Sequence, residues 1–367
     1  MKNYLDFEKE IKTLEQEMET LKSPGSEGIS EVDTTQIKST QDQIDLKLKD
    51  IYSNLDSWQK TQVARHEDRP RANYYIKKIF TNFTALSGDR FFGEDKSVTT
   101  GFGLIGEKSV LVIGQEKGED LNTRINRNFG MMSPEGYRKC IRLMQLANRF
   151  KIPVITFIDT PGAYPGIGAE QRGQASAIAH SIECCMSLKV PNISIIIGEG
   201  GSGGAIALAS SNKVIMLENS IYSVISPEGC ASILWRDPSK SLEAAEAMKL
   251  TAQDLLRLGI IDNIIEEPIG GAHRNHDEIS EKVKKSIIEN LFFFEKLSPD
   301  EVFEHRKNKF LKIGRDGGFM KSSNNKEEGL IYKTPLIQKI RAAIEKNKYI
   351  YLAMGIAIFA TILAINY

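Results

Sequence analysis

Apolar residues recur at three- and four-residue steps over residues 1–69, a spacing typical of amphipathic helices. The first stripe consists of Leu5, Phe7, Ile11, Leu14, Met18 and Leu21. The second stripe consists of Ile37, Ile44, Leu48, Ile51 and Leu55. Proline and glycine in residues 23–28 favour a loop between the stripes. The pattern predicts a helical arm over residues 1–72, with its second helix from about Thr35 to His66, serving in packing or as an interface.

From about residue 73 to residue 295, short apolar runs alternate with helical stretches. The expected strands are residues 109–115, 153–159, 192–198, 213–217 and 221–225. The expected helices are residues 133–150, 167–188, 203–209, 251–258 and 277–294. Near-continuous apolar strands joined by helices favour a buried, mostly parallel sheet. The sequence therefore predicts an α/β domain over residues 73–305.

The last part of the chain changes in charge. Residues 306–348 hold twelve Lys or Arg against four Asp or Glu, with glycine and serine typical of a linker, and end in a short basic helix. Residues 349–367 carry no charge, and as a helix they would span about 28 Å, close to the thickness of the hydrocarbon core. We expect a transmembrane anchor there, with the basic side in the cytoplasm. The alternatives are a buried terminal helix and an oligomer contact.

The charge balance and the cysteine content argue against several classes of protein. Forty-eight basic residues balance forty-eight acidic ones, which argues against a surface devoted to nucleic acid. The four cysteines form no CxxC pair and no zinc spacing, so we expect no metal on this chain. Adjacent Cys184 and Cys185 are poorly placed for a disulfide framework, and no secretory signal opens the chain. These features indicate a reducing compartment, the cytoplasm.

Two glycine-rich turns follow expected strands. The first spans residues 160–166 and includes Gly162 and Ala163; the second spans residues 198–204 and leads into an alanine-rich helix. Glycines at a strand-to-helix turn let backbone N–H groups approach a ligand, and the helix start adds partial positive charge. Such a pair suits stabilisation of an oxyanion. Close strand–helix packing alone is the alternative explanation.

Other catalytic motifs are weak. The second turn gives no clean GxGxxG, and the chain has no GxxxxGK[ST], which argues against nucleotide phosphate binding. Ser202 is the centre of a GxSxG pattern, but no histidine and acid follow in a recognisable order. The five histidines are His66, His180, His273, His276 and His305, and none has a suitable partner nearby in sequence.

Several long segments resemble the alpha-subunit family of bacterial acetyl-CoA carboxylase carboxyltransferases. They are residues 128–131 (NFGM), 134–139 (PEGYRK), 158–166 (IDTPGAYPG), 198–205 (GEGGSGGA) and 225–235 (ISPEGCASILW). Shorter matches are residues 5–8 (LDFE), 88–90 (GDR) and 270–274 (GGAHR). The likeness runs collinearly over about residues 5–314. Met132, where the family pattern leads us to expect proline, is one departure, and residues 118–123 carry fewer basic side chains than usual.

The resemblance implies a crotonase-like (ClpP/crotonase) β-β-α superhelix. It also implies transfer of carboxylate from carboxybiotin to acetyl-CoA, forming malonyl-CoA, the first committed step of fatty acid synthesis. The implied partners are a zinc-carrying beta subunit in an α2β2 assembly, the biotin carboxyl carrier protein and biotin carboxylase. The expected oxyanion donors are backbone amides of Gly203 and Gly204, facing Gly162 and Ala163. Further expected contacts to the cofactor come from Gly200, Gly201, Arg138, Arg172 and Glu199, the last three having structural ion pairs as the alternative.

Three other functions are compatible with the sequence. A hydratase or isomerase of the same fold would need a carboxylate base in the pocket. A ClpP-like peptidase would need Ser202 with a histidine and an aspartate. A membrane scaffold with a decayed site would be non-enzymatic, although both glycine turns are intact.

Overall fold

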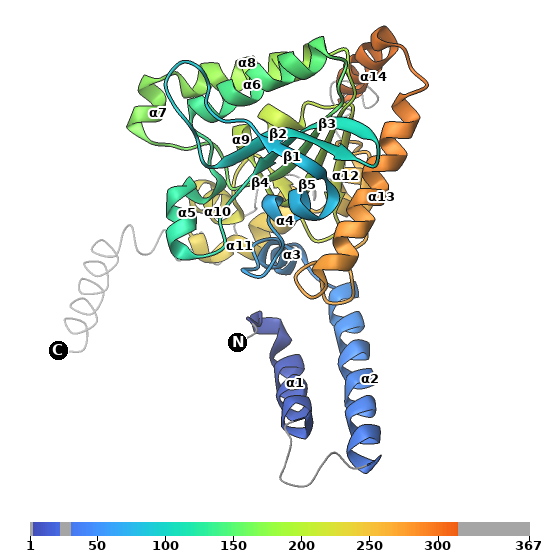
Figure 1. Ribbon diagram of the computed structural model, residues 1–367. Coiled ribbons are helices and arrows are strands. Elements are labelled where there is room, and N and C mark those ends of the chain that lie inside the picture. The colour runs from blue at the N-terminus through green and yellow to red at the C-terminus, as the bar shows by residue number, and fades with distance from the viewer. Residues whose placement is uncertain (1–2, 23–30, 315–367) are drawn as a thin grey trace, which may run out of the picture. The chain divides into compact units, whose positions relative to one another are not determined.

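The computed structural model describes residues 3–22 and 31–314 (Figure 1). Within them, one mixed sheet has the order β1-β2-β3-β4-β5-β6-β8, and β7 pairs with β5. The strands are β1 (Thr81–Ala85), β2 (Val98–Ile105), β3 (Lys108–Gln115), β4 (Val154–Thr160), β5 (Asn192–Gly201), β6 (Lys213–Leu217), β7 (Ile221–Ser223) and β8 (Asn263–Ile265). Strands β1 to β3 pair antiparallel, and the pairs from β3 to β8 are parallel.

Helices cover both faces of this sheet (Figure 1). The longer ones are α1 (Lys9–Lys22), α2 (Glu31–Ser53), α6 (Pro134–Arg149), α8 (Gln174–Ser187), α13 (His276–Phe294) and α14 (Pro299–Lys312). The shorter ones are α3 (Ser57–Ala64), α4 (Ala72–Ile79), α5 (Leu121–Asn126), α7 (Ile167–Gln171), α9 (Ser202–Ala209), α10 (Pro227–Leu234), α11 (Ser241–Met248) and α12 (Ala252–Arg257). Short 3₁₀ segments occur at Asp6–Glu8, Asn128–Gly130 and Pro238–Lys240.

The core forms two layers because neighbouring strand residues point to opposite faces. Ile113 on β3 packs in one cluster with Leu143 of α6 and residues of α8 and α9. Its neighbour Val112 packs in the other cluster with Ile76 of α4 and Ile287 of α13. Every residue of β4 and of β5 is buried, as expected for central parallel strands. The sheet thus holds the ends of β4 and β5 rigidly at its centre.

The expected parallel strands are confirmed, and two expected helices are each interrupted. The helix predicted over residues 35–66 breaks after Ser53, because Asp56 caps a new helix by accepting the backbone N–H of Gln59 at 2.7 Å. The helix predicted over residues 167–188 breaks at Gly173, which has a left-handed φ of 81°. Glycine adopts this conformation without steric cost. The antiparallel strands β1 and β2 and the short edge strand β8 were not predicted.

The expected domain limits fall close to or inside helices. Residue 72 is the first residue of α4, and α14 runs through the limit expected after residue 305. Arg306, beyond that limit, is fully buried and donates a hydrogen bond to the backbone carbonyl of Leu188. The described part of α14 therefore packs on the α/β domain.

The N-terminal helices pack on each other and bond to a distant loop. Ile11 and Met18 of α1 and Ile44 and Leu48 of α2 form a small buried cluster. Arg274 donates to Glu8 and to Glu15, each at 2.8 Å. These ion pairs link the start of the chain to the loop before α13.

In residues 3–22 and 31–314, no helix is both long enough and apolar enough to cross a bilayer. The anchor predicted over residues 349–367 lies outside the described residues, as do most of the basic residues predicted as a linker. All four cysteines are free and buried.

Candidate active site

The two glycine-rich turns meet at the carboxyl ends of β4 and β5. Thr160 on β4 pairs with Gly200 on β5. A Cβ atom on Gly201 would lie 2.1 Å from the carbonyl oxygen of Pro161. A Cβ atom on Gly204 would lie 2.5 Å from the carbonyl carbon of Gly162 and 2.9 Å from the Ala163 nitrogen. Both positions lack room for a side chain, so the backbone of Gly204 lies directly against that of Gly162 and Ala163.

The first turn of α9 presents backbone N–H groups beside this contact. Gly201 is its N-cap, and no side chain in the described part of the chain caps it. The first N–H groups of a helix have no partner within the helix, and the helix dipole favours negative charge there. Gly203, in this turn, is partly exposed. Its position has room for a Cβ atom, which would approach Ile178 at 3.5 Å, whereas Gly204 has none.

Gly162 holds the shape of the first turn. Its N–H donates to Thr160 Oγ1 at 3.2 Å, and the Thr160 hydroxyl donates back to the Gly162 carbonyl at 2.6 Å. The Gly162 amide is therefore engaged within its own turn. Ser202, Gly203 and Gly204 are better placed than Gly162 to donate to a ligand.

A cavity of about 420 Å³ lies next to the start of α9. Its lining is mostly apolar and consists of Ser202, Gly203, Ile206, Tyr222, Ser223, Val224, Met248, Leu255 and Ile260. Tyr222 comes from β7, the strand that pairs with the glycine end of β5. Burial raises the pKa of Tyr222 to about 12, so it is neutral near pH 7. The cavity can hold an uncharged ring with a polar edge near the α9 amides.

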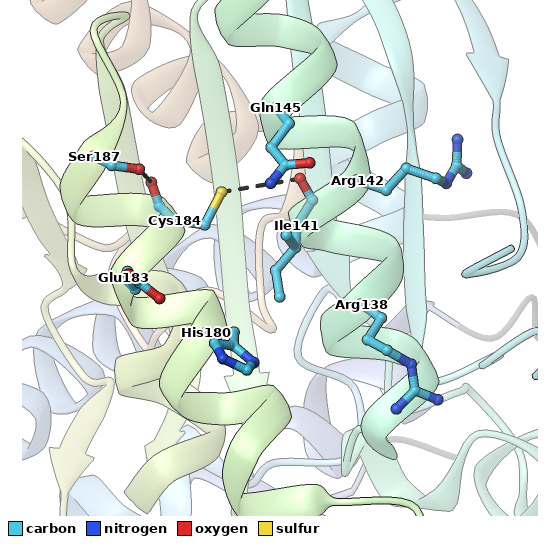
Figure 2. A pocket seen from close by; sticks show the side chains of 8 residues that line it. All are labelled: Arg138, Ile141, Arg142, Gln145, His180, Glu183, Cys184 and Ser187. Carbon is cyan, nitrogen blue, oxygen red and sulfur yellow. Dashed lines mark hydrogen bonds between the residues drawn. The ribbon is translucent and has the colours of Figure 1, made fainter. Parts of the chain in front are cut away.

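The two arginines expected at the cofactor lie in ion pairs. Arg138 donates to Asp89 at 2.8 Å, and Arg172 donates to Glu135 at 2.7 Å. Their guanidinium groups also lie over the rings of Phe91 and Phe92. Arg138 lines a separate groove between α6 and α8, which contains no glycine of either turn among the described residues (Figure 2).

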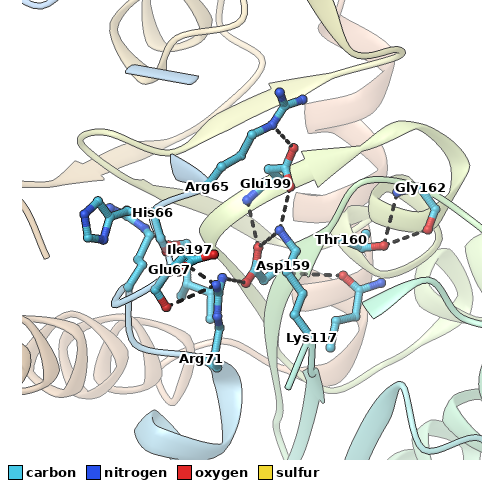
Figure 3. Close-up of polar contacts among 12 residues, drawn as sticks. Arg65, His66, Glu67, Arg71, Lys117, Asp159, Thr160, Gly162, Ile197 and Glu199 are labelled. Carbon is cyan, nitrogen blue, oxygen red and sulfur yellow. Dashed lines mark hydrogen bonds and ion pairs between the residues drawn. The ribbon is translucent and has the colours of Figure 1, made fainter. Parts of the chain in front are cut away.

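Charged side chains form a buried network behind the two turns (Figure 3). Asp159, the residue before Thr160, pairs with Lys117 at 2.7 Å and with Arg71 at 3.1 Å. Glu199, the residue before Gly200, pairs with Lys117 at 2.6 Å and with Arg65 at 2.6 Å. Arg65 also pairs with Glu228 of α10 at 2.5 Å.

The network keeps both buried carboxylates ionised. Burial by itself would raise the pKa of Asp159, but Lys117 and Arg71 outweigh it and hold that pKa below its ordinary value. Burial likewise opposes ionisation of Glu199, and Lys117 and Arg65 hold its pKa low. Glu199 is therefore a paired anion, not a protonated acid.

Lys117, Arg65 and Arg71 were not predicted from the sequence. The available signal was the acid at the start of each glycine turn, because a buried carboxylate requires a cation. The sequence does not show which cations reach them, since Arg65 and Arg71 lie 134 and 88 residues from their partners.

A second cluster joins two histidines. Glu8, His66 and His273 have ligand atoms within 4.8 Å of one another, and the imidazole rings stack 3.9 Å apart. His66 is already bonded through both nitrogens, to the carbonyl of Asn3 and the backbone N–H of Asp68, each at 3.1 Å. Glu8 is in turn paired with Arg274 at 2.8 Å, so two of the three groups already have partners. This cluster fits a packed junction better than a metal site.

Ser202 has part of the geometry of a nucleophile. Its positive φ of 50° occurs at a sharp strand-to-helix turn, and the residue is exposed. A nucleophilic serine of the elbow type occupies such a turn. Across the described residues, no histidine is hydrogen-bonded to it. The histidine hydrogen bonds go instead to Asn3, Asp68, Ser176 and Asn212. The peptidase alternative lacks its base.

Comparison with known proteins identifies the family. Residues 4–314 match the family described as acetyl co-enzyme A carboxylase carboxyltransferase-like. The chain belongs to this family. Its relatives include the acetyl-coenzyme A carboxylase carboxyl transferase subunit alpha of Pelagibacter ubique (strain HTCC1062), 68% identical over 87% of each chain. The same subunit of Cereibacter sphaeroides (strain ATCC 17029 / ATH 2.4.9) is 52% identical over 86% of this chain and 99% of its own.

The solved structures agree on the fold. A transcarboxylase 12S crystal structure with methylmalonyl-coenzyme A bound superimposes with a TM-score of 0.51 at 17% identity. The alignment covers 60% of this chain and 41% of that one. The crotonase-like fold expected of a carboxyltransferase is confirmed. As a family member, the chain is a carboxyltransferase subunit of acetyl-CoA carboxylase, which implies acetyl-CoA as substrate, biotin-linked carboxyl transfer and a partner subunit.

Proposed function

We propose that the two glycine turns form the biotin side of the carboxyltransferase site. The observation that carries this proposal is the direct contact of Gly204 with the backbone of Gly162 and Ala163, at the first turn of α9. The N–H groups of Gly203 and Gly204 there stabilise negative charge on the ureido oxygen of biotin. One such preorganised donor contributes on the order of 3 kcal/mol to transition-state stabilisation.

The chemistry explains why these N–H groups suffice without a side-chain base. Held beside the Gly203 and Gly204 amides, carboxybiotin would supply CO2, and its ureido N1 would supply the base for the proton that acetyl-CoA loses, so the charge to be stabilised would lie on the ureido oxygen. The protein's task is to hold donors at developing oxyanions and to exclude water. This favours carboxyl transfer over a hydratase, because Asp159 and Glu199 are already paired with buried cations.

The cavity beside α9 fits the apolar part of biotin. Ile206 and Val224 line it and are 42% and 78% exposed, leaving apolar surface for a ring and its chain. Gly200 and Gly201 have no side chain to project from the end of the strand below the turn. Arg138, Arg172 and Glu199 act in this proposal through their ion pairs and not by touching biotin.

The second half of the site comes from the partner. We expect an α2β2 assembly in which the beta subunit carries a zinc ribbon and binds most of acetyl-CoA. The biotin carboxyl carrier protein delivers the carboxyl group that biotin carboxylase loads. The purified chain alone should therefore not transfer carboxylate.

The test is Gly203→Val in the assembled complex. The position tolerates a Cβ atom, so the variant should fold, while the branched side chain blocks the approach of the ligand to the amide. We expect malonyl-CoA decarboxylation in the presence of biotin to fall about 100-fold, the loss typical of one oxyanion donor.

Ser202→Ala is the matched control in the same turn and should keep most of the rate. Wild-type turnover in a folded Gly203→Val complex would exclude the amide site. Gly204→Val is less informative. The sequence alone suggests that this variant folds normally, but the contact with Gly162 means that a side chain at this position displaces the backbone.

A further inference from the structure

One lysine side chain lies between the two acids at the start of the glycine turns (Figure 3). The ammonium nitrogen of Lys117 is 2.7 Å from Asp159 Oδ1 and 2.6 Å from Glu199 Oε2. Among the described residues, it is the single cation in contact with both carboxylates. Asp159 comes directly before the first turn and Glu199 is the second residue of the other, so one ammonium group contacts a side chain at the start of each turn.

The Asp159 carboxylate also bonds to the backbone of Glu199. The N–H of Glu199 donates to Asp159 Oδ1 at 3.0 Å, and a Cβ atom on Gly198 would come within 2.5 Å of that oxygen. The ends of β4 and β5 are therefore in contact through the same carboxylate that Lys117 holds. A movement of this carboxylate would change the distance between the two turns.

A glutamine two residues before Lys117 continues this connection to α9. Gln115 accepts the backbone N–H of Asp159 at 3.2 Å and donates to the carbonyl of Gly204 at 2.8 Å. The end of β3 thus contacts the end of β4, the end of β5 and the first turn of α9. Lys117 is the charged member of this set.

We propose that Lys117 is a positioning residue for carboxyl transfer. Its ammonium group fixes the spacing of the two turns and hence the direction of the N–H groups at the start of α9; this rests on the function proposed above for those groups. Lys117 is 8% exposed, and its ammonium group is held between two carboxylates, so it acts through Asp159 and Glu199 and not on substrate.

Removing the ammonium group leaves two anions facing each other. The carboxylates then separate or take up a proton, and the turns shift with them. In the Lys117→Met complex we expect kcat to fall by about 100-fold, as for one misplaced oxyanion donor, while KM for acetyl-CoA stays within about twofold. Lys117→Arg restores the charge and should recover part of kcat.

Lys139→Met is the matched control. Lys139 is also a buried lysine, 1% exposed, and it donates to Glu94 and to the carbonyls of Asp95 and Val98, at neither glycine turn. Both Met variants lose a buried ammonium group and should lower Tm. In the folded complex, only Lys117→Met should lower kcat.

The pH dependence of kcat distinguishes a positioning role of Lys117 from a general loss of structural stability. Without Lys117, Asp159 and Glu199 lose a cation, so their pKa values rise and the acid limb of the kcat profile should move to higher pH. Lys139→Met should leave that limb in place. If Lys117→Met does not assemble, Lys117→Gln is measured in the same way and judged by the same outcomes.

The outcomes are distinct. A folded Lys117→Met complex with normal kcat, or equal loss in both Met variants, overturns the Lys117 proposal. Normal turnover in Gly203→Val overturns the amide site itself, and the Lys117 proposal falls with it. Loss in Gly203→Val with normal kcat in Lys117→Met overturns only the positioning role.

Discussion

Asp159 is a fully charged side chain in the interior, and three contacts explain how it remains so. Lys117 and Arg71 supply two positive charges, and the N–H of Glu199 donates to the same carboxylate. An unpaired carboxylate at this depth would instead take up a proton. The sequence could show that an acid stands at the start of each glycine turn, but not that one lysine pairs with both acids.

The lowered pKa values predict how stability responds to acid. The pKa of Asp159 and that of Glu199 lie below their ordinary values of 3.8 and 4.5. Such groups stabilise the fold above the unfolded-state pKa and lose that effect as pH falls through the folded-state pKa. The contribution of these two groups to the free energy of unfolding, followed by urea titrations against Asp159→Asn, should therefore be level above about pH 5 and fall below about pH 4.

Asp159→Asn provides the control for this titration. It removes one of the two groups, so its acid-induced loss should be shallower than that of the unmodified chain. Stability that rises as the pH is lowered from about 5 to about 3 would contradict the assignment.

Elements were predictable where one physical signal dominates. The central strands β4 and β5 are continuous apolar runs, which the sequence shows directly, and α6 has a clear helical stripe starting at Pro134. Strand β2 was missed because Gly101 and Gly103 interrupt its pattern. The absence of side chains at those glycines leaves space for the ring of Phe83 on β1. A Cβ atom on Gly101 would lie 2.7 Å from that ring. Only the tertiary contact explains them.

The break between α2 and α3 is decided by a single cap. Asp56 accepts the N–H of Gln59 at 2.7 Å, and Gln59 accepts the N–H of Asp56 at 3.0 Å. These two hydrogen bonds form a reciprocal capping box. Helical periodicity continues across this point, so the apolar pattern alone did not reveal the interruption.

Asp56→Ala tests the cap. We expect the free energy of unfolding to fall by about 1 kcal/mol, the usual cost of losing such a residue, measured by urea titration. Asp56→Asn keeps the acceptor and should lie within a few tenths of a kcal/mol of the unmodified chain. Equal losses of unfolding free energy in both variants would show that the hydrogen bond from Gln59 to residue 56 does not stabilise the fold.

At the scale of the whole molecule, family and fold could be predicted from long motifs, because residues 128–235 hold most of them in one collinear stretch. The backbone part of the site could be predicted, because the two glycine-rich turns can be recognised in the sequence. The charged network behind it joins residues from α3 to α10 and becomes visible when the chain is folded.

The membrane anchor stays a prediction from the sequence of residues 349–367. If it spans a bilayer, the full-length chain should resist carbonate extraction from membranes, because this uncharged segment is held in hydrocarbon. A chain ending at Lys348 should be extracted and should keep carboxyltransferase activity with its partner. Full-length protein found entirely in the soluble fraction would contradict the anchor.

The ion pairs of Arg274 with the first helices can form only late in protein synthesis. Glu8 leaves the ribosome early, yet its partner is translated 266 residues later. At roughly 5–20 residues per second, the wait is on the order of 13–50 seconds. During that interval, the apolar stripes of α1 and α2 have mainly each other to cover them. The nascent N-terminus is thus the segment on which a ribosome-associated chaperone would act longest.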